Sequence, residues 1–579
     1  MKDMLKKLMV LLDAAQKRRM VLIVIMMVIA ALLETASITI VIGVVSLVIS
    51  PEAIHSNKYL AAVYDNLGFK STVSFTVTVM VCLILAFVVK NVYLFLQWKV
   101  MYSFVYKNQF RTSERMMRNY LRRGYEYYLF ADTAVVQRNI TSDVNNMYGL
   151  ILSLLQIVAE GFVFLSLVIV LLLQDARMCF IIAGLLLVTL LIIKAVMKPM
   201  MEKAGKDNQD YYAGLFKIIS QTVTGIKEVK VTGKEQYFVK QYNICGQGYV
   251  NAVQRYSLFS NVPKLFIETV CVAGMILYML ILLVNGENLA DKLPTFTAFG
   301  LGAVKLMPCA NKINNLLNNI SYFKPFFMGV SDNLQDEIDN KNTDMSFANL
   351  ADKKLEVKKS INLKDITYAY PKTDRLIFDH ADMEIPIGAA VGVVGASGAG
   401  KTTVVDILLG LLELQSGGVY ADDVNTKDHY RAWLKNVGYI PQMIFMLDDT
   451  IRANVAFGVN PDDIDEDRVW AVLKEAQLDE YIRSLPEGLD TKIGERGIRI
   501  SGGQRQRIGI ARALYEDPEV LILDEATSAL DGDTEAAIMD SINSLHGRKT
   551  LIIIAHRLQT IEKCDMIYRV SEGKIDRER

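Results

Sequence analysis

Residues that build covalent or metal-bound frameworks are scarce in this sequence. Its 579 residues include only six cysteines, and no two of them form a C-x-x-C pair. We therefore expect reduced thiols that pack as small apolar groups, and no structural zinc site. Histidine is just as scarce, at five residues, and four of the five have no motif around them.

Charge of one sign is also missing. The 63 lysines and arginines balance 63 aspartates and glutamates, so no overall field favours nucleic acid as a partner. A cleavable signal peptide is not expected, because the first apolar run, at 20–50, is far longer than the apolar core of such a peptide. Lys17, Arg18 and Arg19 precede this run, which therefore predicts a membrane helix that is retained.

Long apolar runs are what the sequence has in quantity. Apolar residues make up 52% of the chain, and the mean hydropathy is +0.25. A helix needs about 20 such residues to cross a bilayer. Six stretches reach or approach this length, and the last is the weakest because Gly300, Gly302 and Pro308 interrupt it. The six predicted membrane helices are 20–50, 71–98, 147–174, 178–198, 262–285 and 293–311.

Lysine and arginine are unevenly distributed among the connecting segments. The N-terminus and the long segments 99–138 and 198–255 are rich in them, whereas 51–70, 174–177 and 286–292 hold few. The positive-inside rule places the cation-rich segments in the cytoplasm. Six crossings then return the rest of the chain, with the C-terminus, to the cytoplasm. The two long segments have helical patterns, which predicts membrane helices that continue into the cytoplasm as rods.

Two further helices are predicted at the membrane surfaces. Residues 3–16 are amphipathic, with Lys6 and Lys7 opposite an apolar face, which is typical of a helix lying on the inner surface. Residues 57–69 have apolar and aromatic residues at helical spacing, and either an external interfacial helix or an ordinary structured loop fits them. The apolar face of the first helix consists of Met4, Leu5, Leu8, Leu11 and Leu12.

The character of the chain changes near residue 330. Charged residues crowd into 331–360, and from 361 onward short apolar strands alternate with helices and glycine-rich turns. This alternation is typical of an α/β domain. We predict a helical membrane domain at 1–330, a linker at 331–360 and an α/β domain at 361–579.

A phosphate-binding loop follows an apolar strand in the α/β domain. The strand at 390–394 runs into G-A-S-G-A-G-K-T at 395–402, and a helix follows, as the P-loop pattern requires. The loop's N–H groups would surround phosphate oxygens, Lys401 would pair with the β- and γ-phosphates, and Thr402 would ligate Mg²⁺. The loop residues of this predicted ATP site are Gly395, Ala396, Ser397, Gly398, Ala399, Gly400, Lys401, Thr402 and Thr403.

A second apolar strand, at 520–524, ends in two acids. Asp524 and Glu525 would lie at the carboxyl edge of the sheet, where ligands bind in such domains. Asp524 is expected to hold Mg²⁺, directly or through water. Glu525 is expected to orient and deprotonate the attacking water, as a general base.

Together with the sequence I-S-G-G-Q at 500–504, these elements identify the chain as a member of the ATP-binding-cassette (ABC) proteins. The resemblance implies further roles: Tyr370 stacks on adenine, Gln442 senses Mg²⁺ and water, and His556 contacts the γ-phosphate. It also implies a D-loop at 528–531. The residues that would contribute to the site of the other subunit are Ser501, Gly502, Gly503, Gln504 and Asp531.

The order of the domains resembles that of an exporter-type half-transporter. In that family two cassettes enclose two ATP molecules, and each site combines the P-loop of one chain with the Ser-Gly-Gly segment of the other. Since every catalytic position is intact here, the resemblance implies a homodimer and ATP hydrolysis coupled to transport. Coupling to the membrane domain would run through the turns near 125–132 and 232–238.

Three lysines lie within or beside the predicted membrane helices, where a charge is costly. Lys90, Lys264 and Lys305 would all face a cavity from the side of the inner leaflet and form a site for an anionic headgroup such as a pyrophosphate. Alternatively, Lys264 pairs with Glu268, one turn away. Glu34 and Glu160 fit either buried structural pairing or the cavity.

The membrane half also resembles bacterial lipid-linked oligosaccharide flippases, through N-V-P-K at 261–264, K-L-M-P-C-A-N at 305–311 and Glu34. The resemblance implies transport of a polyprenyl-pyrophosphate glycan across the inner membrane. That subgroup has arginines where this chain has its three lysines, so the charge is kept while the bidentate guanidinium is lost. An exporter of lipid A precursors or of hydrophobic drugs is the alternative within the class. An ATP-gated channel or regulator on the same fold is the alternative outside it.

Overall fold

The computed structural model describes residues 2–49, 64–66, 68–69, 71–174, 176–285, 293–338, 353–525, 532–555 and 561–579. The chain forms two compact units: Met1–Leu121 with Ala131–Asn342, and Arg122–Phe130 with Thr343–Arg579. Between 342 and 343 the chain passes from one unit to the other, inside the segment 331–360. The predicted domain boundaries themselves remain a prediction, and the predicted external helix at 57–69 lies mostly outside the described residues.

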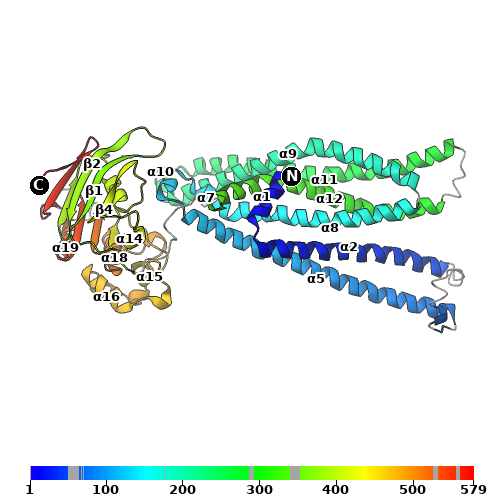
Figure 1. The fold of residues 1–579 in the computed structure, drawn as a ribbon, viewed down its shortest axis with the longest axis horizontal. Coiled ribbons are helices and arrows are strands. Elements are labelled where there is room, and N and C mark those ends of the chain that lie inside the picture. Colours follow the sequence, from blue (N-terminus) through cyan, green and yellow to red (C-terminus); the bar gives the residue numbers. More distant parts are fainter. Residues whose placement is uncertain are drawn as a thin grey trace. The chain divides into compact units, whose positions relative to one another are not determined.

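Long helices that run alongside one another make up the first unit (Figure 1). Among the described residues, five helices are long and apolar enough to cross a membrane. They cover the first five predicted spans, and α12 covers the sixth, so the predicted helical membrane domain is confirmed. The helices are α1 (Lys2–Leu11), α2 (Ala14–Ile49), α5 (Thr72–Leu121), α7 (Thr133–Arg138), η1 (Asn139–Asp143), α8 (Val144–Gln174), α9 (Ala176–Thr224), α10 (Ile226–Thr232), α11 (Glu235–Val284) and α12 (Leu293–Ile338).

Helices α5 and α11 have 50 residues each. At 1.5 Å per residue each is about 75 Å long, more than twice the ~30 Å hydrocarbon core of a bilayer. They therefore continue beyond the membrane as rods, as predicted. Close contact between rods depends on Gly205 of α9, where an added Cβ would lie 2.0 Å from the Tyr322 carbonyl oxygen of α12.

Short helices interrupt the chain between the long ones. The first, α6 (Tyr125–Phe130), falls within the turn predicted at 125–132. The second, α10, begins after Gly225 and ends before Gly233, at φ 60°; α11 begins at Glu235, so the chain turns within the predicted range 232–238. A left-handed residue of this kind is a common helix terminator.

The amphipathic helix α1 packs against the first unit. Met4, Leu8, Leu11 and Leu12 are buried in a cluster with residues of α2, α5, α8 and α12. Leu5, predicted on the same face, is instead 42% exposed, as are its neighbours Met9 at 43% and Val10 at 53%. The helix therefore has apolar residues on the outside as well.

The second unit contains two sheets, which confirms the predicted α/β domain. A four-stranded sheet has the order β2-β1-β4-β5, and a six-stranded sheet has the order β10-β9-β3-β8-β7-β6. In the larger sheet, only β10 is antiparallel to its neighbour. The strands are β1 (Ser360–Ala369), β2 (Leu376–Pro386), β3 (Ala390–Val394), β4 (Ser416–Ala421), β5 (Val424–Asn425), β6 (Val437–Ile440), β7 (Val520–Asp524), β8 (Thr550–Ile554), β9 (Met566–Ser571) and β10 (Lys574–Arg577).

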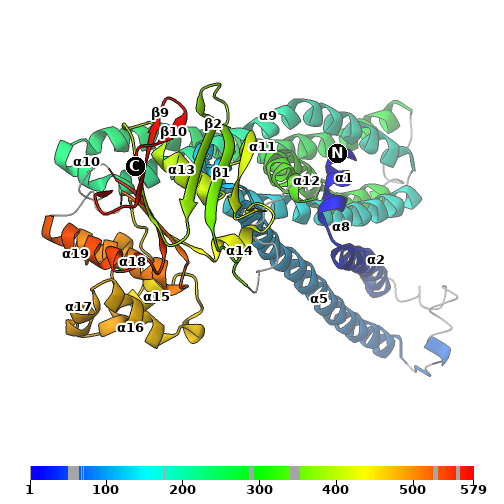
Figure 2. The same ribbon diagram turned by 60° about the vertical axis from the view of Figure 1, so that its left-hand side comes forward.

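Every residue of β3, β7 and β8 is buried, which is typical of parallel strands covered on both faces. Figure 2 shows the sheets with α13, α14 and the group around α18. The helices of this unit are α6, α13 (Lys401–Leu408), α14 (Tyr430–Leu434), α15 (Ile451–Val455), α16 (Glu466–Glu475), α17 (Asp479–Ser484), α18 (Gly502–Tyr515) and α19 (Gly532–Asn543), with short turns at η4 (Pro461–Asp463), η5 (Gly488–Asp490) and η6 (Glu495–Gly497).

Candidate nucleotide-binding site

The carboxyl edge of the six-stranded sheet brings the predicted motifs together. β6, β7, β8 and β3 are adjacent and parallel, so their carboxyl ends share one edge. The P-loop follows β3, Asp524 ends β7, and Gln442 comes two residues after β6. Segments far apart in the sequence thus converge where α/β sheets bind their ligands.

Glycines make the sharp turn from β3 into α13 possible. Gly398 has φ 79° and Gly400 has φ 108°, in the region that residues with a Cβ disfavour. At Gly395 an added Cβ would lie 2.5 Å from the Val570 carbonyl oxygen, and at Gly400 one would lie 2.9 Å from the Ile377 side chain. The loop therefore needs glycine both for its backbone angles and for space.

Lys401 begins α13 and is only 5% exposed. Its Nζ donates to the carbonyl oxygens of Gly395 and Ala396, at 3.0 and 3.1 Å. The ammonium therefore folds back over the loop that precedes it. A buried cation beside a glycine-rich loop at a helix N-terminus is suited to a polyphosphate.

Acidic groups lie close together after β7. The Gln442 side-chain amide donates to Glu525 Oε2 at 2.7 Å, joining the segments after β6 and β7. Burial, followed by the neighbouring charge of Glu525, raises the pKa of Asp524, while Tyr439, Thr402 and Lys401 oppose this shift. Glu525 has φ 49°, unusual for a residue with a side chain, and such strained backbone is often found at functional sites.

Asp524 offers an oxygen that suits a divalent cation. Its side chain is almost fully buried, and Oδ1 has no hydrogen-bond partner within the part of the chain that the structure describes. Thr402 is close enough to hydrogen-bond to this carboxylate. Mg²⁺ is usually bound by one or two carboxylates together with substrate phosphates, so this pair of side chains fits the ion.

The structure also describes Tyr370, predicted to stack on adenine, and Ser501, predicted to reach the site of a second subunit. Tyr370 follows β1 and its hydroxyl lies 3.0 Å from Thr403 Oγ1, which brings the ring beside the first turn of α13. Ser501 caps α18: Gln504 N donates to Ser501 Oγ at 3.2 Å and Ser501 N donates to Gln504 Oε1 at 2.8 Å. This reciprocal capping box fixes the helix N-terminus, while Ser501 and Gly502 stay exposed. His556 and Asp531 lie outside the described residues.

Glu126 of α6 is a site residue that the sequence reasoning missed. Its Oε1 accepts from the Tyr368 hydroxyl and from Glu413 N, both at 3.0 Å. Lys372 lies over the ring of Phe130, also in α6, at 5.3 Å. Burial, and secondly Glu126 itself, raises the pKa of Tyr368, so the hydroxyl keeps its proton and donates. No periodic pattern marks such a residue; the only signal was its place in a predicted turn.

The predicted lysines have different surroundings. Lys90 Nζ lies 3.5 Å from Ser37 Oγ of α2 and 4.5 Å from the ring centroid of Phe87. Lys264 is exposed, and no ion pair joins it to Glu268, both being described residues. Lys305 is on α12, but its side chain is outside the described part. Glu160 pairs with Lys312 across α8 and α12, which favours the structural reading of Glu160.

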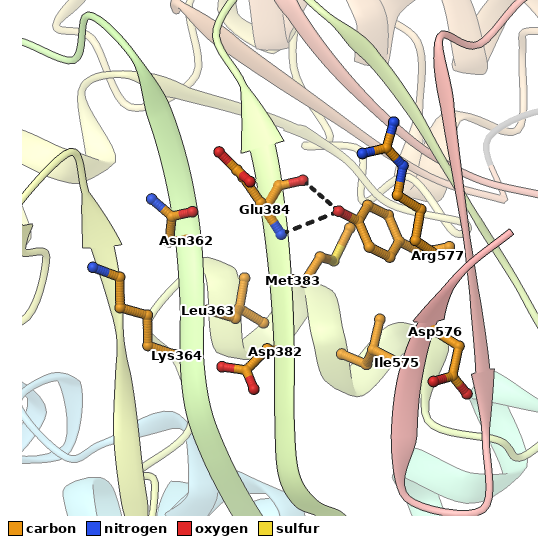
Figure 3. Close-up of a pocket in the computed structure, with 10 residues that line it drawn as sticks. Asn362, Leu363, Lys364, Asp382, Met383, Glu384, Ile575, Asp576 and Arg577 are labelled. Carbon is orange, nitrogen blue, oxygen red and sulfur yellow. Dashed lines mark hydrogen bonds between the residues drawn. The ribbon is translucent and has the colours of Figure 1, made fainter. Parts of the chain in front are cut away.

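A separate cavity lies elsewhere in the second unit. Its volume is about 370 Å³, and it lies between β1, β2 and β10 (Figure 3). The Tyr568 hydroxyl there donates to the Glu384 carbonyl oxygen at 2.9 Å and accepts from Glu384 N at 3.3 Å. Lys364, Arg577, Asp382 and Asp576 also line it. None of the lining residues belongs to the nucleotide motifs, so this cavity is distinct from the candidate site.

Comparisons with known proteins agree with this geometry. A family profile described as "ABC transporter" matches residues 378–528, and one described as "ABC transporter transmembrane region" matches 20–301. The ATP-dependent lipid A-core flippase of Ralstonia nicotianae is 27% identical over 80% of this chain and 79% of its own. The flippase of the same name from Desulfotalea psychrophila is 30% identical over 69% and 68%.

A solved structure of a bacterial Atm1-family ABC exporter with ATP bound has the same fold. Its TM-score is 0.73 at 22% identity, and the match covers 97% of this chain and 95% of the other. The two profiles lie on the two units in the order that exporters have, membrane region first. The chain therefore belongs to the ABC transporters of the exporter type, multi-pass membrane proteins that bind ATP and couple its hydrolysis to transport.

Proposed function

We propose that this protein is an ATP-driven flippase for an amphipathic anionic lipid, most specifically a lipid-linked (polyprenyl-pyrophosphate) oligosaccharide, in the bacterial inner membrane. The observation that carries the proposal is Lys90, a lysine of a membrane-spanning helix whose recorded partners are a hydroxyl and an aromatic ring rather than a carboxylate. An ammonium in such a place is costly unless an anion meets it. Relatives named lipid A-core flippases support a lipid as the cargo.

Lys264 and Lys305 complete the proposed headgroup site. Lys264 directly follows Pro263 within α11, and its side chain is exposed. Lys305 lies on α12 next to the buried Leu306. Three ammonium groups can meet the negatively charged oxygens of a pyrophosphate, which accept short, charge-assisted hydrogen bonds.

For the ATP site, we propose Tyr370 and Gly395–Thr403 as nucleotide-binding residues. Thr402, Gln442 and Asp524 would hold Mg²⁺, which neutralises phosphate charge when bound. Glu525 would act as the base, kept in position by its hydrogen bond from Gln442, and His556 would contact the γ-phosphate. Ser501, Gly502, Gly503, Gln504 and Asp531 would complete the site of a second copy.

We also propose a homodimer, which the same arrangement supports. The N-terminus of α18 is capped by its own Ser501, exposed, and suited to an anion presented from outside the chain. Met443 and Ile498, near Gln442 and the signature, are 87% and 80% exposed, and apolar surface of this kind favours burial against a partner. We further propose that both termini are cytoplasmic, from the distribution of cations.

Replacing Lys90, Lys264 and Lys305 together by glutamine is expected to abolish lipid flipping while basal ATP hydrolysis stays within about twofold of wild type. The reason is that the charge that meets the headgroup is lost, whereas the cassette is untouched. The measurement is ATP-dependent movement of a labelled polyprenyl-pyrophosphate oligosaccharide in proteoliposomes. A matched triple variant, Lys198, Lys203 and Lys206 to glutamine, removes three exposed lysines of α9 and should transport normally. Undiminished flipping by the first variant would remove the headgroup site.

The same assay separates the alternatives. A protein that moves lipid A-like or drug-like amphiphiles but not the labelled glycan lipid would be an exporter of another cargo. A gate or regulator would open on ATP binding and would need little hydrolysis, so sustained turnover stimulated by substrate argues against it.

Glu126→Ala is expected to uncouple the two activities. The carboxylate that accepts from Tyr368 and Glu413 is lost, so α6 is held less firmly by the cassette. We expect lipid flipped per ATP hydrolysed to fall at least about fivefold, the lower range of measured coupling effects, with basal hydrolysis retained. Glu114→Ala, which breaks the exposed pair with Arg118 on α5, serves as the control because such pairs contribute little. An unchanged ratio of transport to hydrolysis would exclude Glu126 from coupling.

A further inference from the structure

A cavity of about 430 Å³ lies in the first unit, between the turn that joins α1 to α2 and the helices α5, α8 and α12. It is remote in sequence from the three lysines of the proposed headgroup site. One wall is apolar, and the other carries two arginines. The apolar wall includes Leu11, Leu12, Met147 and Leu334. The volume is in the range of cavities that hold small ligands.

Most polar groups of the cavity wall are already paired. The Gln16 side chain donates to Asn108 Oδ1 at 3.0 Å, and the hydroxyls of Thr112 and Tyr148 lie 2.8 Å apart. Asp13, the only acid in the lining, caps α2 and accepts from Gln16 N. The acid is therefore held at the start of α2 by the protein.

Of the two arginines, only Arg111 differs from these groups in the part of the chain that the structure describes. Arg115 donates to the Leu11 carbonyl oxygen at 3.2 Å and so holds the end of α1 against the cavity. Arg111 is exposed, and within the described ranges it has no hydrogen bond or ion pair. Lys107, Arg111 and Arg115 are spaced four residues apart, on one face of α5. Like charges at this spacing destabilise a helix unless an anion lies beside them.

The sequence next to the cavity leads us to expect it at the level of the cytoplasmic membrane surface. Asp13 is followed within two turns of α2 by the cationic run Lys17, Arg18 and Arg19, and directly afterwards by the apolar span. Such a run marks the headgroup zone of the inner leaflet. The exposed apolar residues of α1, Leu5, Met9 and Val10, are suited to the adjoining acyl region.

We propose that this cavity binds an anionic phospholipid of the inner leaflet. The phosphodiester lies against Arg111 and the cationic face of α5, and the glycerol and upper acyl carbons cover Leu11, Leu12 and Met147. Basic cavities between membrane helices on the cytoplasmic side are known to take such headgroups. The inference is independent of the transported substrate, because it concerns different residues: on α5, Arg111 lies 21 positions beyond Lys90.

The test is photolabelling of the full-length protein in nanodiscs. The probe is a phosphatidylglycerol with a photoreactive group on its upper acyl chain, diluted into phosphatidylcholine, and labelled peptides are identified by mass spectrometry. Labelling should concentrate in 2–20 and 101–116. Arg111→Gln should weaken it roughly tenfold, as loss of a charged hydrogen bond implies. Arg111→Lys should retain part of it. Arg255→Gln, which removes an exposed arginine of α11 outside the cavity, should leave it unchanged.

Four outcomes would overturn the proposal. Equal labelling by a phosphatidylcholine probe would mean an apolar groove without headgroup recognition. Loss of labelling when excess inorganic phosphate is present would indicate that the ligand is a soluble anion. Loss of labelling when polyprenyl pyrophosphate is present would indicate that the cavity belongs to the path of the transported lipid. Undiminished labelling of an Arg111→Gln protein that unfolds at the wild-type temperature would exclude Arg111. The flipping assay above reports on transport separately, so failure of one proposal leaves the other decidable.

Discussion

Glu525→Gln is expected to lower the rate of ATP hydrolysis by at least about 100-fold, since positioned bases contribute roughly 10²–10⁴. The substitution keeps the size and shape of the side chain, and its amide oxygen can still accept the hydrogen bond that Gln442 now donates to Glu525 Oε2. The loop after β7 should therefore keep its conformation, while the side chain can no longer accept a proton from water. ATP affinity, measured by equilibrium binding, should stay within about threefold of wild type, because hydrogen bonding around the nucleotide is unchanged.

Glu519→Gln is the matched control, an exposed acid one residue before β7. It should hydrolyse ATP at the wild-type rate. Near-normal turnover by the Glu525 variant would overturn the assignment of the base and would direct attention to Asp524 or to the undescribed segment that holds His556. A joint loss of binding and hydrolysis would instead indicate that Glu525 supports the fold of the site.

Lys401→Ala should weaken ATP binding by roughly 100-fold. Hydrogen bonds to charged groups contribute about 1.5–3 kcal/mol each, and tenfold in affinity corresponds to about 1.4 kcal/mol. The structure adds a second reason. Lys401 is buried and donates to the carbonyl oxygens of Gly395 and Ala396, so its removal also frees the loop that presents the amide groups. Binding of a fluorescent ATP analogue to the purified protein is the measurement.

Lys427→Ala provides the comparison, since this lysine of the same unit is exposed and pairs only with Glu413 at the surface. It should bind ATP as wild type does. Unchanged affinity of the Lys401 variant would contradict the P-loop assignment. Lys401→Arg keeps the charge but not the compact shape of the ammonium, so weak binding by that variant too would show that geometry as well as charge matters.

The sequence predicted best those features that local patterns specify. Six apolar runs, the strand before 395–402 and the helix after it, and the acids ending a buried strand all follow from periodicity and turn chemistry over a few residues. The structure contains these elements, with α13 beginning at Lys401 and β7 ending at Asp524. The fold class and the family were therefore accessible from sequence.

Features that depend on distant residues were not accessible. The partner of Glu160 is Lys312, 152 residues away, and the partners of Glu126 are 242 and 287 residues away. Local spacing carries no information on such pairs. Leu5 was assigned to the same apolar face of α1 as Met4, Leu8, Leu11 and Leu12, but only the other four are buried, because contacts with distant helices decide which part of that face is covered.

The membership of α6 in the second unit affects how the protein can be dissected. Residues 122–130 are contiguous in sequence with the membrane rods but are grouped by contact with the cassette. A cassette produced from residue 343 onward would leave Tyr368 Oη, a group of a fully buried residue, without the carboxylate it now meets. Such a fragment would expose the surface that α6 now contacts, and its melting temperature would be lower. Adding the nine-residue peptide 122–130 in trans should restore part of the lost thermal stability. The unit that folds together therefore includes a segment that lies far from the rest of it in the sequence.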